Sequence, residues 1–328
     1  MNKKVFSNIV ILGILVVIVI GLVGCFPVGK QTSTLQKISD YQKLDFFETL
    51  IQYYKIKDPE EKRQVAKILE AKTDASIEAN NKGEIIVAFD LIPRTKDPLF
   101  YDYLVSLLSR FKNDPATVRD IIAKLATLGD KRAIPIIIEY TNESDIYSSV
   151  NSDAARMQLG DDSVLNSLLE YSRSEGIIKV TAIVGLRYSH SQDATNRLKE
   201  IIANNEAWAS DAYRVLENQK ILAMPLKQKK EYLLSLRNAP REDIQRLAFY
   251  LLTELPYDKT LEEVLIPTIE QDFQRVASPG GRVYIGKELR LRQQNFLRSF
   301  IYSDNLRPWV EEKLLKLKQL PDDQPLQT

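Results

Sequence analysis

The chain has 328 residues, of which 44% are hydrophobic and 27% charged, and it contains one cysteine and one histidine. A single cysteine excludes an intramolecular disulfide and a multi-thiolate zinc site, and a single histidine excludes a histidine-rich metal centre. The formal net charge is +1, and without the two lysines of residues 1–24 it is −1. The chain therefore lacks the broad positive field of proteins that bind nucleic acid nonspecifically.

The first 25 residues have the pattern of a secretory signal. Two lysines near the start precede an apolar run over Ile9–Val23, which small residues close. The ending Leu22-Val23-Gly24-Cys25 resembles the lipobox of bacterial lipoproteins. This resemblance implies cleavage after Gly24 and a lipid on Cys25 that anchors the chain in the cell envelope, at the outer membrane in a diderm host. The alternative is an uncleaved transmembrane anchor over Val5–Val23, which is just long enough to span a bilayer.

The segments that flank the remaining chain are polar. Residues 25–40 follow the signal as a lipidated N-terminus and flexible tether, containing Pro27 and Gly29. We expect a folded domain over residues 41–320. The final residues, 321–328 (PDDQPLQT), are expected to form a disordered tail.

Helix–turn–helix units follow one another at intervals of about 32 residues. The clearest turn is Leu128-Gly129-Asp130-Lys131-Arg132-Ala133-Ile134-Pro135, with an apolar helical stripe on each side. Gly129 suits the left-handed position after a helix, Asp130 can cap the next helix, and Pro135 fits a first turn. Leu159-Gly160-Asp161 repeats the turn 31 residues later. Further turns at this period are marked by Asp97, Asp193, Met224-Pro225 and Asp258.

This period is typical of a solenoid, in which each helix pair buries its apolar face against its neighbours. No alternation of β-branched residues indicates strands. The L-G-D-x-R-A-I-P turn resembles HEAT-like repeats of the short, bilin-lyase type. The resemblance implies an all-α fold, a right-handed α-solenoid of about seven HEAT-like helix pairs over residues 41–320. An irregular helical bundle is the alternative.

The resemblance also implies a function, because HEAT-like arrays are known mainly for docking other proteins. We therefore expect a non-catalytic scaffold, with no cofactor and no bound metal, that holds unidentified envelope proteins at the membrane. A minority of such arrays act on tetrapyrroles or carry a di-iron site, so a bilin-lyase-like or di-iron enzyme or ligand binder is the alternative. Di-iron members need several His-Glu pairs, whereas His190 is followed by Ser191. We expect His190 to be an exposed turn residue.

The last repeat carries an insertion, because Asp258 and Asp304 are 46 residues apart. Its segment 277–286 leads into a G-x-x-x-x-G-K match over 281–287, which is the pattern of a phosphate-binding loop. Glu288 replaces the Ser or Thr that would bind Mg²⁺, and no buried strand precedes the loop. The sequence therefore predicts no nucleotide site and no nucleic-acid partner. It leaves 277–286 either a docking loop or a tolerated insertion.

Tyrosine supplies the candidate partner-binding residues. The chain has 15 tyrosines, and this side chain is enriched at protein interfaces. By resemblance to HEAT-like arrays, the second helix of each pair lines the concave side of the solenoid. Tyr101, Tyr140 and Tyr171 lie in successive second helices and are the predicted anchors. The alternative is that these rings complete the packing between repeats.

Overall fold

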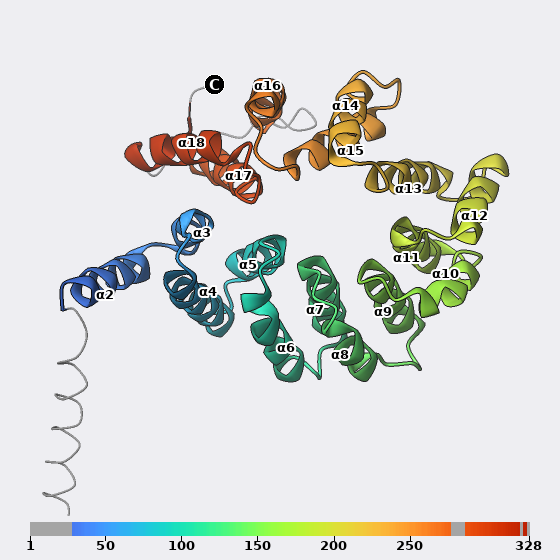
Figure 1. Cartoon of the computed structure of the whole chain (residues 1–328), viewed down its shortest axis with the longest axis horizontal. Coiled ribbons are helices and arrows are strands. Elements are labelled where there is room, and N and C mark those ends of the chain that lie inside the picture. The colour runs from blue at the N-terminus through green and yellow to red at the C-terminus, as the bar shows by residue number, and fades with distance from the viewer. Residues whose placement is uncertain (1–27, 277–285, 322–323, 327–328) are drawn as a thin grey trace, which may run out of the picture. The chain divides into compact units, whose positions relative to one another are not determined.

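The computed structural model describes residues 28–276, 286–321 and 324–326, and every regular element in these ranges is helical (Figure 1). The all-α prediction is confirmed for this part of the chain. The chain divides into two compact units, Met1–Ala75 and Ser76–Thr328.

The first unit contains α2 (Val28–Lys43), α3 (Phe46–Lys55) and all but the last turn of α4 (Pro59–Glu78). The end of α2 is held against α4, because the Tyr41 hydroxyl donates to the Glu61 carboxylate at 2.7 Å. Lys72 donates to the Leu44 carbonyl oxygen at 2.7 Å. The segment that the sequence predicted as a flexible tether up to residue 40 is therefore helical from Val28, and its C-terminal end is packed.

The second unit is a succession of helices and three 3₁₀ turns. They are α5 (Lys82–Arg94), η1 (Pro98–Phe100), α6 (Tyr101–Arg110), α7 (Pro115–Leu128), α8 (Ala133–Tyr140), α9 (Ile146–Gln158), η2 (Asp162–Val164), α10 (Leu165–Tyr171), α11 (Gly176–Gly185), η3 (Leu186–Tyr188), α12 (Gln192–Ala203), α13 (Ala209–Leu222), α14 (Leu226–Leu236), α15 (Glu242–Thr253), α16 (Lys259–Arg275), α17 (Gly286–Arg298) and α18 (Arg307–Gln319).

Helices α5 to α13 of this unit lie in two rows (Figure 1). Helices α5, α7, α9, α11 and α13 pack directly on one another in sequence, and we call them the inner row. Helices α6, α8, α10 and α12 form the outer row. The inner row is on the inside of the curve that the two rows describe, because its helices approach one another more closely.

The turn glycines follow the predicted chemistry, but the predicted cap Asp130 does not: α8 begins at Ala133 without a side-chain cap, and Asp130 accepts from the Arg132 N–H within the turn at 3.0 Å. Gly129 and Gly160 have φ of +86° and +85°, the left-handed conformation that glycine adopts at low cost. Asp114 caps α7 by accepting from the Ala116 N–H at 3.1 Å, and Asp145 caps α9 by accepting from the Tyr147 N–H at 3.0 Å. Each turn therefore fixes where one helix ends and the next begins.

Hydrogen bonds between neighbouring helix pairs recur at a fixed separation of 31 residues. The Tyr101 hydroxyl donates to the Arg132 carbonyl oxygen at 2.9 Å, and the Ser109 and Tyr140 hydroxyls are hydrogen-bonded at 2.8 Å. The Lys96 ammonium donates to the Thr127 carbonyl oxygen with the same separation. Equivalent positions of successive pairs therefore meet in space.

A buried ionic network joins α11 and α12 to the turns that precede and follow this pair. The Glu206 carboxylate accepts from Lys179 at 2.6 Å and from two Arg197 nitrogens at 3.0 and 3.1 Å. Arg197 also donates to the hydroxyl and the carbonyl oxygen of Ser172, at 3.0 and 2.9 Å. Lys179 and Arg197 are only 7% and 6% exposed, so Glu206 pairs with two buried cations, of which Arg197 also pairs with Glu200 at 2.9 Å.

The described part of the C-terminal tail is bound to α17, although the sequence predicted disorder over 321–328. One Arg290 nitrogen donates to the carbonyl oxygens of Pro321 at 2.6 Å and Gln324 at 3.0 Å. The Gln293 amide both donates to and accepts from the Leu326 backbone, at 3.0 and 2.9 Å. Gln293 is fully buried, so the tail covers a polar group that would otherwise lack these partners.

Candidate functional site

Two of the predicted sites cannot be placed. Cys25, the predicted lipid attachment site, and Gly24, after which cleavage is expected, lie outside the described residues. Segment 277–286 is described only at Gly286, where α17 begins. Both predictions therefore depend on the sequence alone.

The three candidate tyrosines each have a partner within the fold. Tyr101 is 8% exposed, and the Arg132 guanidinium lies 4.1 Å from the centre of its ring. Tyr140 is bound to Ser109, and Tyr171 is hydrogen-bonded to Ser149. Burial raises the pKa of Tyr101 and of Tyr171. All three link neighbouring helices, and partner binding by them stays a prediction.

The prediction that the second helix of each pair lines the concave side is wrong. Helices α6, α8 and α10, which carry the three tyrosines, belong to the outer row (Figure 1). The sequence did not distinguish inner-row from outer-row helices, because both helices of each pair carry an apolar stripe and are buried on one face. The residues that face the inside of the curve come from the first helices instead.

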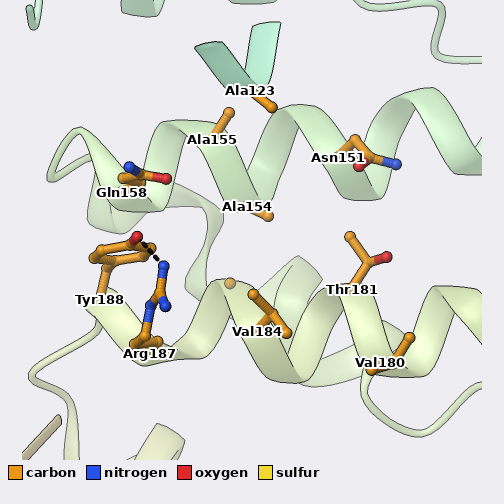
Figure 2. A pocket seen from close by; sticks show the side chains of 11 residues that line it. Ala123, Asn151, Ala154, Ala155, Gln158, Val180, Thr181, Val184, Arg187 and Tyr188 are labelled. Carbon is orange, nitrogen blue, oxygen red and sulfur yellow. Dashed lines mark hydrogen bonds between the residues drawn. The ribbon is translucent and has the colours of Figure 1, made fainter. Parts of the chain in front are cut away.

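The inner row contains a pocket of about 300 Å³ between α7, α9 and α11 (Figure 2). Its lining includes small residues at 31-residue intervals, namely Ala123, Ala154 and Gly185. A Cβ at position 185 would lie 2.9 Å from the Ala154 Cβ, so α9 and α11 are in close contact here. Small side chains at this period therefore both bring the helices together and leave space above them.

Polar side chains complete the lining of this pocket. Asn151 and Gln158 project from α9, Thr181 from α11, and Arg187 and Tyr188 from η3 (Figure 2). The Arg187 guanidinium stacks 4.5 Å from the centre of the Tyr188 ring and donates a hydrogen bond to its hydroxyl. We call this feature the Arg187 pocket. Arg187 is the one charged residue that lines it in the described structure.

Further cations act on the same region. Lys96 lies at the surface near the end of α7, and partial desolvation lowers its pKa. The carboxylate of Glu254 raises the pKa of Lys96, whereas the Arg94 and Arg187 guanidiniums lower it. Arg94 also lies 4.7 Å from the centre of the Tyr302 ring. Three cations therefore lie in this region with two acids, Glu254, which acts on Lys96, and Asp90, which pairs with Arg94 at 3.4 Å.

The first unit contains a second hollow, of about 580 Å³, on α2 and α4. Ile38, Ile68 and Ala71 give it apolar walls, and Lys67 and Lys72 lie at its edge. Lys67 is paired with Glu70, and Lys72 is bound to backbone carbonyls of the α2–α3 turn. Both lysines therefore already have partners within this unit.

His190 is exposed in the turn before α12, as predicted. Over residues 28–276, 286–321 and 324–326, the acidic, histidine and cysteine side chains form no group of three or more that could hold a metal ion. In the same ranges, no helix combines the length and apolar character needed to cross a bilayer.

The Arg187 pocket was not predicted from the sequence, although small residues at the repeat period could have indicated it. Ala123, Ala154 and Gly185 recur at the repeat period, and Ala154 and Gly185 meet where α9 and α11 are in close contact. The chain itself matches no protein-family model, no curated protein and no solved structure.

Proposed function

We propose that this chain is an envelope lipoprotein anchored through Cys25, whose helix pairs form a right-handed HEAT-like α-solenoid of about seven units. We propose further that it is a non-catalytic scaffold for other envelope proteins. The recurrence of contacts at 31 residues supports the repeat architecture, because equivalent positions of successive pairs are bonded. Arrays of this kind present extended surfaces that suit protein docking.

Exposed side chains of the kind found at protein interfaces lie on the first helices of the pairs. Val184 on α11 and Tyr213 on α13 are each 37% exposed, and Tyr250 on α15 is 53% exposed. Tyrosine at such positions offers a large ring and a polar end at a low entropic cost. This favours docking over a catalytic role.

The scaffold proposal is tested by photo-crosslinking in intact cells. A benzoylphenylalanine side chain at Tyr250 or Tyr213 is expected to form discrete adducts with the same envelope proteins. The matched position is Ile138 on outer-row helix α8, which is 49% exposed and is expected to give none of these adducts. Adducts from Ile138 alone would contradict docking on the first helices. Stoichiometric iron or a bound chromophore in the purified protein would favour the enzymatic alternative.

The lipid anchor is tested separately. Cells fed a labelled fatty acid are expected to label the wild-type protein, and the Cys25→Ser variant is expected to carry no label, because the thiol is the acyl-bearing nucleophile of the predicted lipobox. Ser differs from Cys here only in that atom. Label that persists on the Cys25→Ser variant would show that the anchor is elsewhere or absent.

A further inference from the structure

We propose that the Arg187 pocket binds a carboxylate carried by an apolar peptide segment of the docked partner, with the Arg187 guanidinium as the cationic anchor. This inference rests on the docking function proposed above and specifies the chemistry that the partner presents. It assigns a ligand class to a site that the sequence did not reveal.

The hydrogen bonding of Arg187 sets it apart from other arginines held in the fold. Arg197 is paired with Glu206 and Glu200, and Arg156 with Asp161 at 2.7 Å. Arg187 has no carboxylate within ion-pair distance in the described part of the chain, and its Nε is buried without a hydrogen-bond partner. A guanidinium binds a carboxylate best through two parallel N–H donors. The buried Nε–H of Arg187 is therefore a donor for which a carboxylate ligand would supply the missing acceptor.

The electrostatic environment also favours an anion. None of the residues that line the Arg187 pocket is acidic. Lys96 adds positive charge to that of Arg187 and is opposed by one acid, Glu254, whereas the charge of nearby Arg94 is partly compensated by Asp90 at 3.4 Å. A bound carboxylate would reduce the repulsion among these cations, and the low dielectric constant of a partly enclosed site would strengthen that interaction.

The walls of the pocket specify what the carboxylate is attached to. Ala123, Ala154, Val180 and Val184 give the pocket an apolar lining, of which Val184 is labelled nearest to Arg187 on its own chain segment (Figure 2). Val184 is 37% exposed, so a ligand would cover apolar area that now faces water. An inorganic anion would leave this surface exposed. A carboxylate next to an apolar side chain uses both features of the pocket.

The test uses the full chain in detergent micelles, labelled with ¹⁵N-arginine, and follows the Arg187 Nε–H resonance. The Arg187→Lys variant assigns the signal. The probe is N-acetyl-leucine, which carries one carboxylate and one apolar side chain, and its uncharged control is N-acetyl-leucinamide. We expect a saturable shift with the acid and binding weaker by about tenfold or more with the amide, since the charge-assisted hydrogen bonds are lost.

Matched variants at the edge of the pocket separate charge from shape. Val184→Asp places a competing carboxylate beside Arg187 and is expected to weaken N-acetyl-leucine binding by about tenfold. Val184→Asn, of similar size but uncharged, is expected to bind nearly as the wild type does. Arg246→Gln on α15 should leave N-acetyl-leucine binding unchanged, because the Arg246 side chain is 71% exposed and pairs with Glu242 on its own helix. The other arginine resonances report whether each variant is folded.

Several outcomes would overturn the proposal. They are the absence of a saturable shift, equal binding of the amide, or tighter binding of inorganic phosphate or hexanoate than of N-acetyl-leucine. Tighter binding of inorganic phosphate would assign the pocket to free anions, and tighter binding of hexanoate would assign it to alkyl acids. Failure here is distinct from failure of the docking function, because crosslinks at Tyr250 that persist in Val184→Asp would show docking without this pocket.

Discussion

Replacing Glu206 by glutamine is expected to lower the free energy of unfolding by about 3 kcal/mol at neutral pH, because it removes the carboxylate that pairs with buried Lys179 and leaves buried Arg197 paired with the half-exposed Glu200. Hydrogen bonds from Arg197 and Lys179 lower the pKa of Glu206 from 4.5 to about 2. Both cations are less than one tenth exposed, so water screens the interaction weakly. Urea unfolding of wild type and variant, followed by far-UV circular dichroism, measures the difference.

The pH dependence provides an independent check. A carboxyl group whose pKa is lowered by folding contributes its full stability above its unfolded pKa, and that stability is lost as the pH falls toward the folded pKa. The difference between wild type and Glu206→Gln should therefore be constant above about pH 5 and disappear toward about pH 2. Glu242→Gln is the matched control, because Glu242 is 73% exposed and pairs with an exposed arginine. It should cost less than about 0.5 kcal/mol. A difference that persists at low pH would show that Glu206 stabilises the fold by packing rather than by charge.

The local features of the fold followed directly from the sequence. Gly129 and Gly160 adopt the left-handed conformation that the turn pattern predicted. Turn geometry depends on a few neighbouring residues, so one chain suffices to identify it. The all-α content followed from the same local signals.

The placement of the rows could not be predicted in the same way. Both helices of a pair bury one apolar face, and apolar periodicity is the same for a helix on either side of the curve. The row that lies inside is decided by how closely successive helices approach. That distance depends on which side chains meet, and Ala154 and Gly185 meet at a contact that admits no larger side chain.

The candidate site was missed for a related reason. A pocket is a space between helices, and its shape depends on their separation rather than on a motif. Arg187 is one of 45 basic residues, and its sequence neighbours do not distinguish it from a solvated surface arginine. Its unpaired Nε becomes visible only when the surrounding helices are in place. The contacts of Arg290 and Gln293 with the C-terminal tail escaped prediction because they join residues more than 29 positions apart.

Truncation of Leu168 to alanine is expected to lower the free energy of unfolding by about 2–5 kcal/mol, because it opens a cavity in the core that α9 to α13 share. Leu168 on α10 is fully buried, and it packs in one cluster with Ile183, Leu186 and Leu198. In a stack of helix pairs, such a residue stabilises its own pair and the interfaces on both sides. The loss of stability should therefore extend to α9 and α11. Faster hydrogen exchange of the amides in these two helices would detect it.

Leu315→Ala supplies the control for this effect. Leu315 also lies within a helix, α18, but it is 58% exposed, so the same change of side chain removes little buried area. We expect its unfolding free energy to stay within about 0.5 kcal/mol of the wild type. Equal losses for the two variants would mean that Leu168 is not part of a shared core. A large loss confined to Leu168, with faster exchange in α9 and α11 and unchanged exchange in α17 and α18, is the result that successive, mutually supporting helix pairs require.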